Sequence, residues 1–289
     1  MEETVSLAIG AVLLAGLYAT MSYGLALIYG VMKVINLAHA GAIMLGAYAA
    51  YTLYTAFKVD PLVSTLVVVP TFFVFGMVIQ RLLVRRLMKA PPIATLLLLF
   101  GVWLVLQNAA YIIWTGDTRS ILTPYTYTKL WLFGVPIGVS WLAVFTVGVL
   151  TLVLLHQLLT RTYIGKAIRA AAQEQEACQL VGIDVDRVMM VAFGLGFALA
   201  GLAGALMSLL YSIAPDFGGE FMLKSFCITV LGGVESFVGV GLGALVLATA
   251  ETLGGRVLPS TVQNMISFVL LVVVLVTTPG GLMGLLKRR

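Results

Sequence analysis

The sequence predicts an all-α fold, namely a polytopic transmembrane helical bundle of about 8–9 membrane segments, one of them short or broken. Three observations predict this class. Hydrophobic residues make up 61% of the 289 residues and charged residues only 10%. The mean hydropathy is +1.08, and apolar runs of about 18 or more residues recur along the chain. A transmembrane β-barrel would instead show alternating segments of about ten residues.

The apolar stretches fall, in chain order, at about 6–30, 34–56, 61–80, 92–114, 140–159, 188–212, 220–233, 237–254 and 262–280. The first is expected to remain in the protein, because the acidic start "MEETVSLAIG" lacks the basic region of a secretory signal peptide. The seventh is short or broken, because "LGGVESFVGVG" (231–241) interrupts it. Irregular backbone at that depth is tolerated only where protein or a watery cavity covers it.

Most of the 17 lysines and arginines lie in alternate connections between these stretches. The basic connections are at Lys33, 80–89 and 160–187, and the chain ends in "LLKRR". The positive-inside rule predicts that they face the cytoplasm of a prokaryotic plasma (inner) membrane, with the N-terminus outside and the C-terminus cytoplasmic. The longest outer loop is then about 115–139. We see no linker and no second soluble domain, so residues 1–289 are expected to form a single transmembrane domain.

Several kinds of chemistry have no motif in the sequence. The phosphate cradle G-x-x-x-x-G-K-[ST], the zinc motif H-E-x-x-H and the nucleophile elbow G-x-S-x-G do not occur. His39 and His156 are too few and too far apart in the chain to suggest a metal site or a triad. We therefore expect no enzyme and no cofactor bound by this chain. The placement of the basic residues also argues against nucleic-acid binding, and Cys178 and Cys227 do not suggest a disulfide.

Few ionisable residues are candidates for burial in the bundle. The candidates are Lys33, His39, Glu235 and Glu251, and a charge at the centre of a membrane helix costs roughly 2.5–3.5 kcal/mol on insertion scales. Lys33, Glu235 and Glu251 are expected near helix ends, where snorkelling lowers the cost, so only His39 is expected well inside. This is a thin set for ion coupling, although one residue can suffice.

Small residues recur at helical spacing in several stretches. Gly196, Ala200 and Gly204 stand four residues apart and are expected on one helix face. Small residues at this spacing let helices approach closely in lipid. The predicted role is tight bundle packing, with a pore-lining role as the alternative.

One polar segment, "KAIRAAAQEQEACQLVGIDVDR" (166–187), interrupts the apolar pattern. Good helix formers predict a helix over 166–181, which Gly182 would end. Asp184 or Asp186 can cap the helix that follows. The segment can be a solvated loop helix, or a cytoplasmic surface that a membrane subunit offers to a soluble partner.

Four stretches carry a family resemblance. They are "GKAIRAAAQEQEACQLVGIDVDRVMMVAFGLGFALAGLAGAL" (165–206), "SYGLALIYGVMKVINLAHAGAIMLGAYAAY" (22–51), "APPIATLLLLFGVWLVLQNAAYIIWTG" (90–116) and "VLGGVESFVGVGLGALVLATAETL" (230–253). Together they resemble the LivH-type permeases, the membrane subunits of ABC importers for branched-chain amino acids and related compounds. Two departures bear on the substrate, since Ala40-Gly41-Ala42 lacks the family's usual acidic residue after His39, and Glu235 stands where small residues are usual.

The resemblance implies partners that composition does not. Such a permease works with a second homologous permease in a hetero- or homodimer, two cytoplasmic ABC ATPases that bind ATP and Mg²⁺, and an extracytoplasmic substrate-binding protein. The segment "EACQLVG" (176–182) is similar to the E-A-A-x3-G coupling motif, with Cys178 in place of the second alanine. By this similarity Glu176, Ala177 and Gly182 couple the permease to an ATPase, within a cytoplasmic coupling loop of about 160–187.

The function expected from the resemblance is import of branched-chain or related amino acids by ATP-driven alternating access. Five polar residues of the apolar stretches are candidates for the translocation pathway: Asn36, His39, Thr95, Gln107 and Asn108. Each can instead form an interhelical hydrogen bond, on average about 0.6 kcal/mol. The alternatives are a stand-alone ion-coupled secondary transporter of small organic solutes and, more distantly, a membrane scaffold. Other amino acids, amides, urea-like compounds and aromatic acids remain open as substrates.

Overall fold

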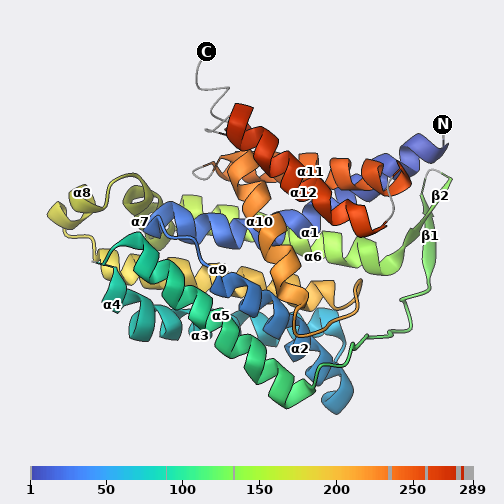
Figure 1. Cartoon of the computed structure of the whole chain (residues 1–289), viewed down its shortest axis with the longest axis horizontal. Coiled ribbons are helices and arrows are strands. Elements are labelled where there is room, and N and C mark those ends of the chain that lie inside the picture. The colour runs from blue at the N-terminus through green and yellow to red at the C-terminus, as the bar shows by residue number, and fades with distance from the viewer. Residues whose placement is uncertain are drawn as a thin grey trace.

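A computed structural model of the chain describes residues 2–88, 90–132, 134–233, 236–257, 260–277 and 281–282. Its elements, in chain order, are α1 (Glu2–Met32), α2 (Ala38–Phe57), α3 (Pro61–Ile79), η1 (Gln80–Val84), α4 (Arg85–Leu87), α5 (Pro92–Trp114), β1 (Lys129–Leu132), β2 (Val135–Gly138), α6 (Val139–Arg161), α7 (Tyr163–Gln173), α8 (Gln175–Leu180), α9 (Val185–Met207), α10 (Phe217–Gly232), α11 (Phe237–Val257) and α12 (Ser260–Thr277). Helices α1, α6 and α9 run alongside one another, whereas α10 crosses them steeply and α5 and α12 run diagonally in the same view (Figure 1).

Local sequence fixes several helix starts. At α3 the Asp60 carboxylate accepts a hydrogen bond from the Leu62 backbone N–H at 2.8 Å, and Pro61 occupies the first helical position. The Thr162 hydroxyl caps α7 by accepting from the Gly165 N–H at 3.1 Å. Of the two aspartates proposed as caps for α9, Asp184 fills the role and accepts from the Arg187 N–H at 3.0 Å.

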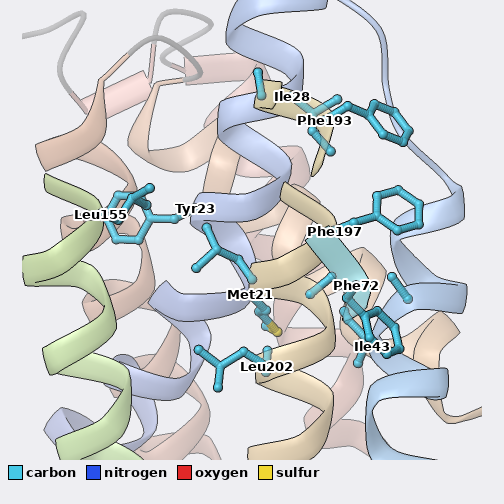
Figure 2. Packing of buried hydrophobic residues seen from close by; sticks show 14 of the residues in the cluster. Met21, Tyr23, Ile28, Ile43, Phe72, Leu155, Phe193, Phe197 and Leu202 are labelled. Carbon is cyan, nitrogen blue, oxygen red and sulfur yellow. The ribbon is translucent and has the colours of Figure 1, made fainter. Parts of the chain in front are cut away.

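Helix α9 is the centre of the bundle, and 83% of its most apolar window is buried within the chain. It packs against α1, α2 and α3. The Phe193 and Phe197 rings of α9 stack with centroids 4.9 Å apart, and Figure 2 shows Phe193, Phe197 and Phe72 of α3 following one another along this contact. The hydrophobic core of the bundle therefore lies around α9.

The predicted packing residues lie on the buried surface of this helix. Ala200 is fully buried. A Cβ atom added to Gly196 would lie 2.7 Å from the Gly24 carbonyl oxygen of α1, and one added to Gly204 would lie 1.9 Å from the Ile43 carbonyl oxygen of α2. Only a residue without a side chain permits backbones to approach this closely.

The connections collect at two ends of the bundle. At one, here called the α8 end, the Gln175 side chain reaches the end of α1 and Arg85 pairs with Asp186. At the other, here called the hairpin end, the Arg119 N–H donates to the Ile213 carbonyl at 2.9 Å. Helices α7 and α8 mark the first end, and the β1–β2 hairpin and the start of α1 mark the second (Figure 1).

A hydrogen bond inside the hairpin end joins the long loop between α5 and α6 to the α2–α3 connection. The Tyr125 hydroxyl donates to both carboxylate oxygens of Asp60 at 2.9 Å. Burial raises the pKa of Tyr125, and its hydrogen bond to the Asp60 carboxylate raises that pKa further. The phenol therefore stays protonated at neutral pH and remains a donor.

The structure supports a polytopic helical membrane protein. Among the described residues, six helices are long and apolar enough to cross a membrane: Glu3–Met32, Pro61–Leu87, Pro92–Trp114, Val139–Arg161, Val185–Met207 and Phe237–Arg256. Met265–Thr277 in α12 is a shorter apolar helix. The number of crossings stays a prediction. The interruption predicted within 231–241 includes Gly233, which ends α10 at φ +91°, and residues 234–235, among them Glu235, which lie outside the described residues.

Three local predictions are corrected. The stretch at 188–212 is helical only to Met207, where α9 ends. The loop predicted at about 115–139 contains an antiparallel hairpin that pairs Lys129 with Gly138 and Leu132 with Val135, which was not predicted from the sequence. The helix predicted over 166–181 is two helices, because Glu174 adopts an extended conformation at φ −152° and separates α7 from α8.

Candidate functional site

The α7–α8 segment is an exposed polar structure at the α8 end. Helix α7 is held by Ala167, Ile168 and Ala171, which are at most 3% exposed. Helix α8 is held by Cys178, which is 5% exposed. The opposite faces of both helices are exposed. The segment therefore packs on the bundle with one face and presents the other to its surroundings.

The coupling residues predicted from the sequence lie on this open surface. Glu176 and Ala177 are exposed on α8. Gly182 follows α8 at φ +80°, a conformation that favours glycine, with no atom within 4 Å of an added Cβ. Between them Leu180 and Val181 are 89% and 75% exposed. An apolar tip beside a carboxylate suits contact with another protein better than contact with water alone.

One side-chain contact connects this segment to α1, and a second contact nearby joins two other elements of the α8 end. The Gln175 side-chain amide donates to the Val31 carbonyl, in the last turn of α1, at 2.6 Å. The Arg85 guanidinium pairs with the Asp186 carboxylate at 2.6 Å, joining α4 to the start of α9. Helix α8 is therefore joined by a hydrogen bond to the end of α1.

Two pathway candidates lie together just beyond that end of α1. Asn36 and His39 are fully buried, and the His39 backbone N–H donates to the Asn36 carbonyl at 3.3 Å. The His39 Nε2–H donates to the Met21 carbonyl at 2.9 Å. The Asn36 side-chain amide and His39 Nδ1 have no hydrogen-bond partner among the described residues. Unpaired polar atoms at this depth are unusual and call for a functional explanation.

The other three candidates are spread along α5. Thr95 is buried near its start, and its hydroxyl donates to the Leu87 carbonyl at 3.3 Å. Gln107 is half-buried, and Asn108 is exposed with its amide donating to the Leu104 carbonyl at 2.8 Å. Thr95 and Asn108 are about 20 Å apart along the helix axis, at 1.5 Å per residue. The structure therefore does not gather these three into one site.

A buried charge cluster was missed by the sequence analysis. Lys224 of α10 is 7% exposed, and its ammonium lies 3.4 Å from the Glu251 carboxylate of α11 and 3.2 Å from that of Glu220. It also donates to the Tyr18 hydroxyl of α1 at 3.2 Å. The Glu251 carboxylate accepts further hydrogen bonds from the hydroxyls of Tyr18 and Ser267. The cluster joins α1, α10, α11 and α12.

The prediction that Glu251 snorkels near a helix end is therefore wrong. The side chain is only 10% exposed, because α11 continues to Val257 and places Glu251 beside Lys224. The position of Lys224 within the stretch at 220–233 was the available signal. Lys224 follows Glu220 by four residues, a spacing typical of ion pairs on the exposed face of a helix. The sequence alone therefore does not show that Lys224 is buried.

Comparison with known proteins places the chain in a family. The model of the branched-chain amino acid transport system, permease component, matches residues 7–275. The chain belongs to this family. The prediction of a LivH-type permease, the membrane component of an ABC importer, is thereby confirmed, and its relatives are transporter components rather than enzymes.

Individual relatives match almost end to end. The high-affinity branched-chain amino acid transport system permease protein LivH of Escherichia coli (strain K12) is 29% identical over 94% of this chain and 93% of its own. The high-affinity branched-chain amino acid transport system permease protein BraD of Pseudomonas aeruginosa is 30% identical over 92% of this chain and 91% of its own. A probable branched-chain amino acid transport permease protein LivH of Methanocaldococcus jannaschii is 26% identical over 95% of this chain and 91% of its own. No solved structure matches the chain.

Proposed function

We propose that this chain translocates branched-chain or related amino acids into the cell, as the permease subunit of an importer driven by ATP. The observation that carries the proposal is the family match over residues 7–275. The names of its relatives supply the substrate class. Residues 1–289 would act as a single transmembrane domain, and transport would proceed by alternating access.

The proposed assembly contains a second homologous permease, two cytoplasmic ATPases that bind ATP and Mg²⁺, and an extracytoplasmic binding protein. Helix α8, with Glu176, Ala177 and Gly182, is the proposed contact with an ATPase. Its exposure supports this role, as does the hydrogen bond from Gln175 to Val31. Motion of α8 would be passed through α1 toward Asn36 and His39, whose unpaired buried polar atoms support a place on the pathway.

The proposed topology places the α8 end in the cytoplasm and the start of α1 outside. The described basic residues at the α8 end outnumber those at the hairpin end: Lys33, Arg81, Arg85, Arg86, Arg161, Lys166, Arg169 and Arg187 against Lys58, Arg119, Lys129 and Arg256. An excess of lysine and arginine marks the cytoplasmic side of a membrane protein.

The test is uptake of radiolabelled leucine by cells that express the chain with its ATPase, second permease and binding protein. Glu176→Lys and Gly182→Val are expected to abolish uptake and to reduce co-purification of the ATPase, while the protein stays inserted. Asp117→Lys, the same charge reversal at the hairpin end, is the control and is expected to leave ATPase binding unchanged. In the same assay, Asn36→Ala tests the pathway and is expected to reduce uptake with ATPase binding intact.

Normal uptake and ATPase binding by Glu176→Lys would contradict the coupling assignment. Uptake by the purified chain alone, driven by an ion gradient, would contradict the importer and favour a secondary transporter.

A further inference from the structure

Two adjoining cavities form a groove on the side of α6 near the α8 end, here called the α6 groove. The first is an open hollow of about 520 Å³ that is lined, in the described part of the chain, by α6 alone, from Val149 to Arg161. The second, about 340 Å³, lies between α1, α6, α7 and the start of α11, and includes Arg169 and Gln173. His156 and Thr160 line both, so the two cavities adjoin at these side chains.

The groove extends over the depth of one membrane leaflet. Helix α6 has 23 residues, which makes it about 34 Å long, close to the full hydrocarbon thickness of about 30 Å. The midplane then falls near residue 150. From Val149 to Arg161 is about 18 Å along the axis, whereas one leaflet of hydrocarbon is about 15 Å deep.

The two ends of the groove differ in chemistry. Near the midplane its residues are apolar, and Val149 and Val153 are 38% and 48% exposed. At the other end stand Arg161 and Arg169, both exposed and without an ion-pair partner among the described residues. Among the described residues, no aspartate or glutamate lines either cavity. Tyr163, two residues after Arg161, is 76% exposed. Exposed tyrosines are common at the level of the lipid headgroups.

Polar side chains also line the groove below the arginines. His156 and Gln157 are exposed on α6, and His156 lies about 7–8 Å deeper than Arg161 at 1.5 Å per residue. Bare acyl chains would leave these polar groups without partners. The ester oxygens and glycerol of a phospholipid occur at that depth and can accept and donate hydrogen bonds.

We propose that the α6 groove binds an anionic phospholipid of the inner leaflet, with its phosphate between Arg161 and Arg169 and an acyl chain along Val149 and Val153. Basic pockets between membrane helices on the cytoplasmic side are suited to anionic headgroups. The apolar half of the groove favours a lipid over free phosphate. The site lies beside α7 and the end of α1, so its occupant would brace the segment that leads to α8.

The test is native mass spectrometry of the full-length chain, purified in detergent and titrated with phosphatidylglycerol or phosphatidylcholine of matched acyl chains. The wild type is expected to retain phosphatidylglycerol in preference. The double variant Arg161→Gln/Arg169→Gln is expected to weaken that retention roughly tenfold or more, since each basic residue near an anionic lipid contributes measurably. Lys58→Gln/Arg256→Gln, with the same loss of charge at the hairpin end, is the control and is expected to behave as the wild type.

A second pair of variants tests the acyl part of the groove without changing charge. Val153→Trp fills the groove and is expected to reduce retention, whereas Val272→Trp on the exposed face of α12 is expected not to. Equal retention by the wild type and both groove variants would overturn the proposal. Displacement of the lipid by inorganic phosphate would also overturn it, and would indicate a free-anion site. So would rapid disulfide-linked dimer formation by Gln157→Cys in membranes, which would show that a second copy of the chain covers the groove.

Discussion

At the scale of single residues, Lys224 and Glu251 form an ion pair with little exposure to solvent. Their side chains are 9% and 10% exposed, and each charge has the other as its buried partner. A buried ion pair is weak evidence for net stability, but removing one partner leaves an uncompensated charge that is strongly destabilising. Because the cluster joins four helices, its loss would loosen α10 from α1, α11 and α12.

Lys224→Met is expected to lower the free energy of unfolding by about 3–5 kcal/mol. Lys224→Met/Glu251→Gln, which removes both charges, is expected to recover much of that loss. The measurement is unfolding of the purified chain in mixed micelles with increasing denaturing detergent. As a control, Arg256→Met removes the exposed ion pair with Glu3, whose side chains are 43% and 84% exposed, and should cost about 1 kcal/mol or less. An equal effect of the two single variants would show that the Lys224 charge is not buried in solution.

The depth of these charges could not be predicted from the sequence. Hydropathy locates a membrane helix because it averages the apolar character of a segment. It does not say which face of that helix is covered by neighbouring helices. Lys224 stands next to Glu251 only because α10 runs obliquely against α11 and α1, a tertiary arrangement. Asn36 and His39, by contrast, were recognisable as candidates because polar residues are rare in that stretch.

At the scale of elements, the separation of α7 from α8 shows tertiary contacts overriding local preference. Glutamine, glutamate and alanine around Glu174 all favour a helix, and nothing in the local sequence predicts a break. The burial of Cys178 and the hydrogen bond from Gln175 to Val31 fix α8 in its own direction. The helix ends set by Asp60, Asp184 and Gly182 were more predictable, because capping depends on neighbours in the chain.

The contact between α9 and α2 gives a prediction at the same scale. Gly204→Ala would place a methyl group against the Ile43 carbonyl, 1.9 Å from its oxygen, and overpacking of this kind costs typically about 1–3 kcal/mol. Gly101→Ala on α5, with no atom within 4 Å of the added Cβ, is the matched control and is expected to be neutral or slightly stabilising. Thermal unfolding in detergent compares the two, and a stable Gly204→Ala would contradict the close approach of these helices.

At the scale of the whole molecule, the topology is testable by cysteine labelling in intact cells. Both native cysteines are free and buried, so a background of Cys178→Ala/Cys227→Ala is suitable. A membrane-impermeant maleimide is expected to label Asp117→Cys from outside, and Lys166→Cys only after the membrane is opened. The opposite pattern would invert the proposed orientation. The cysteine-free background, which should not react, is the control.

The central position of α9 also has a consequence for how the protein is made. Helices α1, α2 and α3, against which it packs, all precede it in the chain. When α9 is synthesised, α1, α2 and α3 have already been made. The small residues of α9 can therefore pack against these helices as soon as α9 enters the membrane. Helix α1 is in the reverse situation, since its partner α11 is synthesised more than 200 residues later. Helix α1 thus completes its contacts only after α11 has been made, and until then the side of α1 that packs against α11 lacks this neighbour.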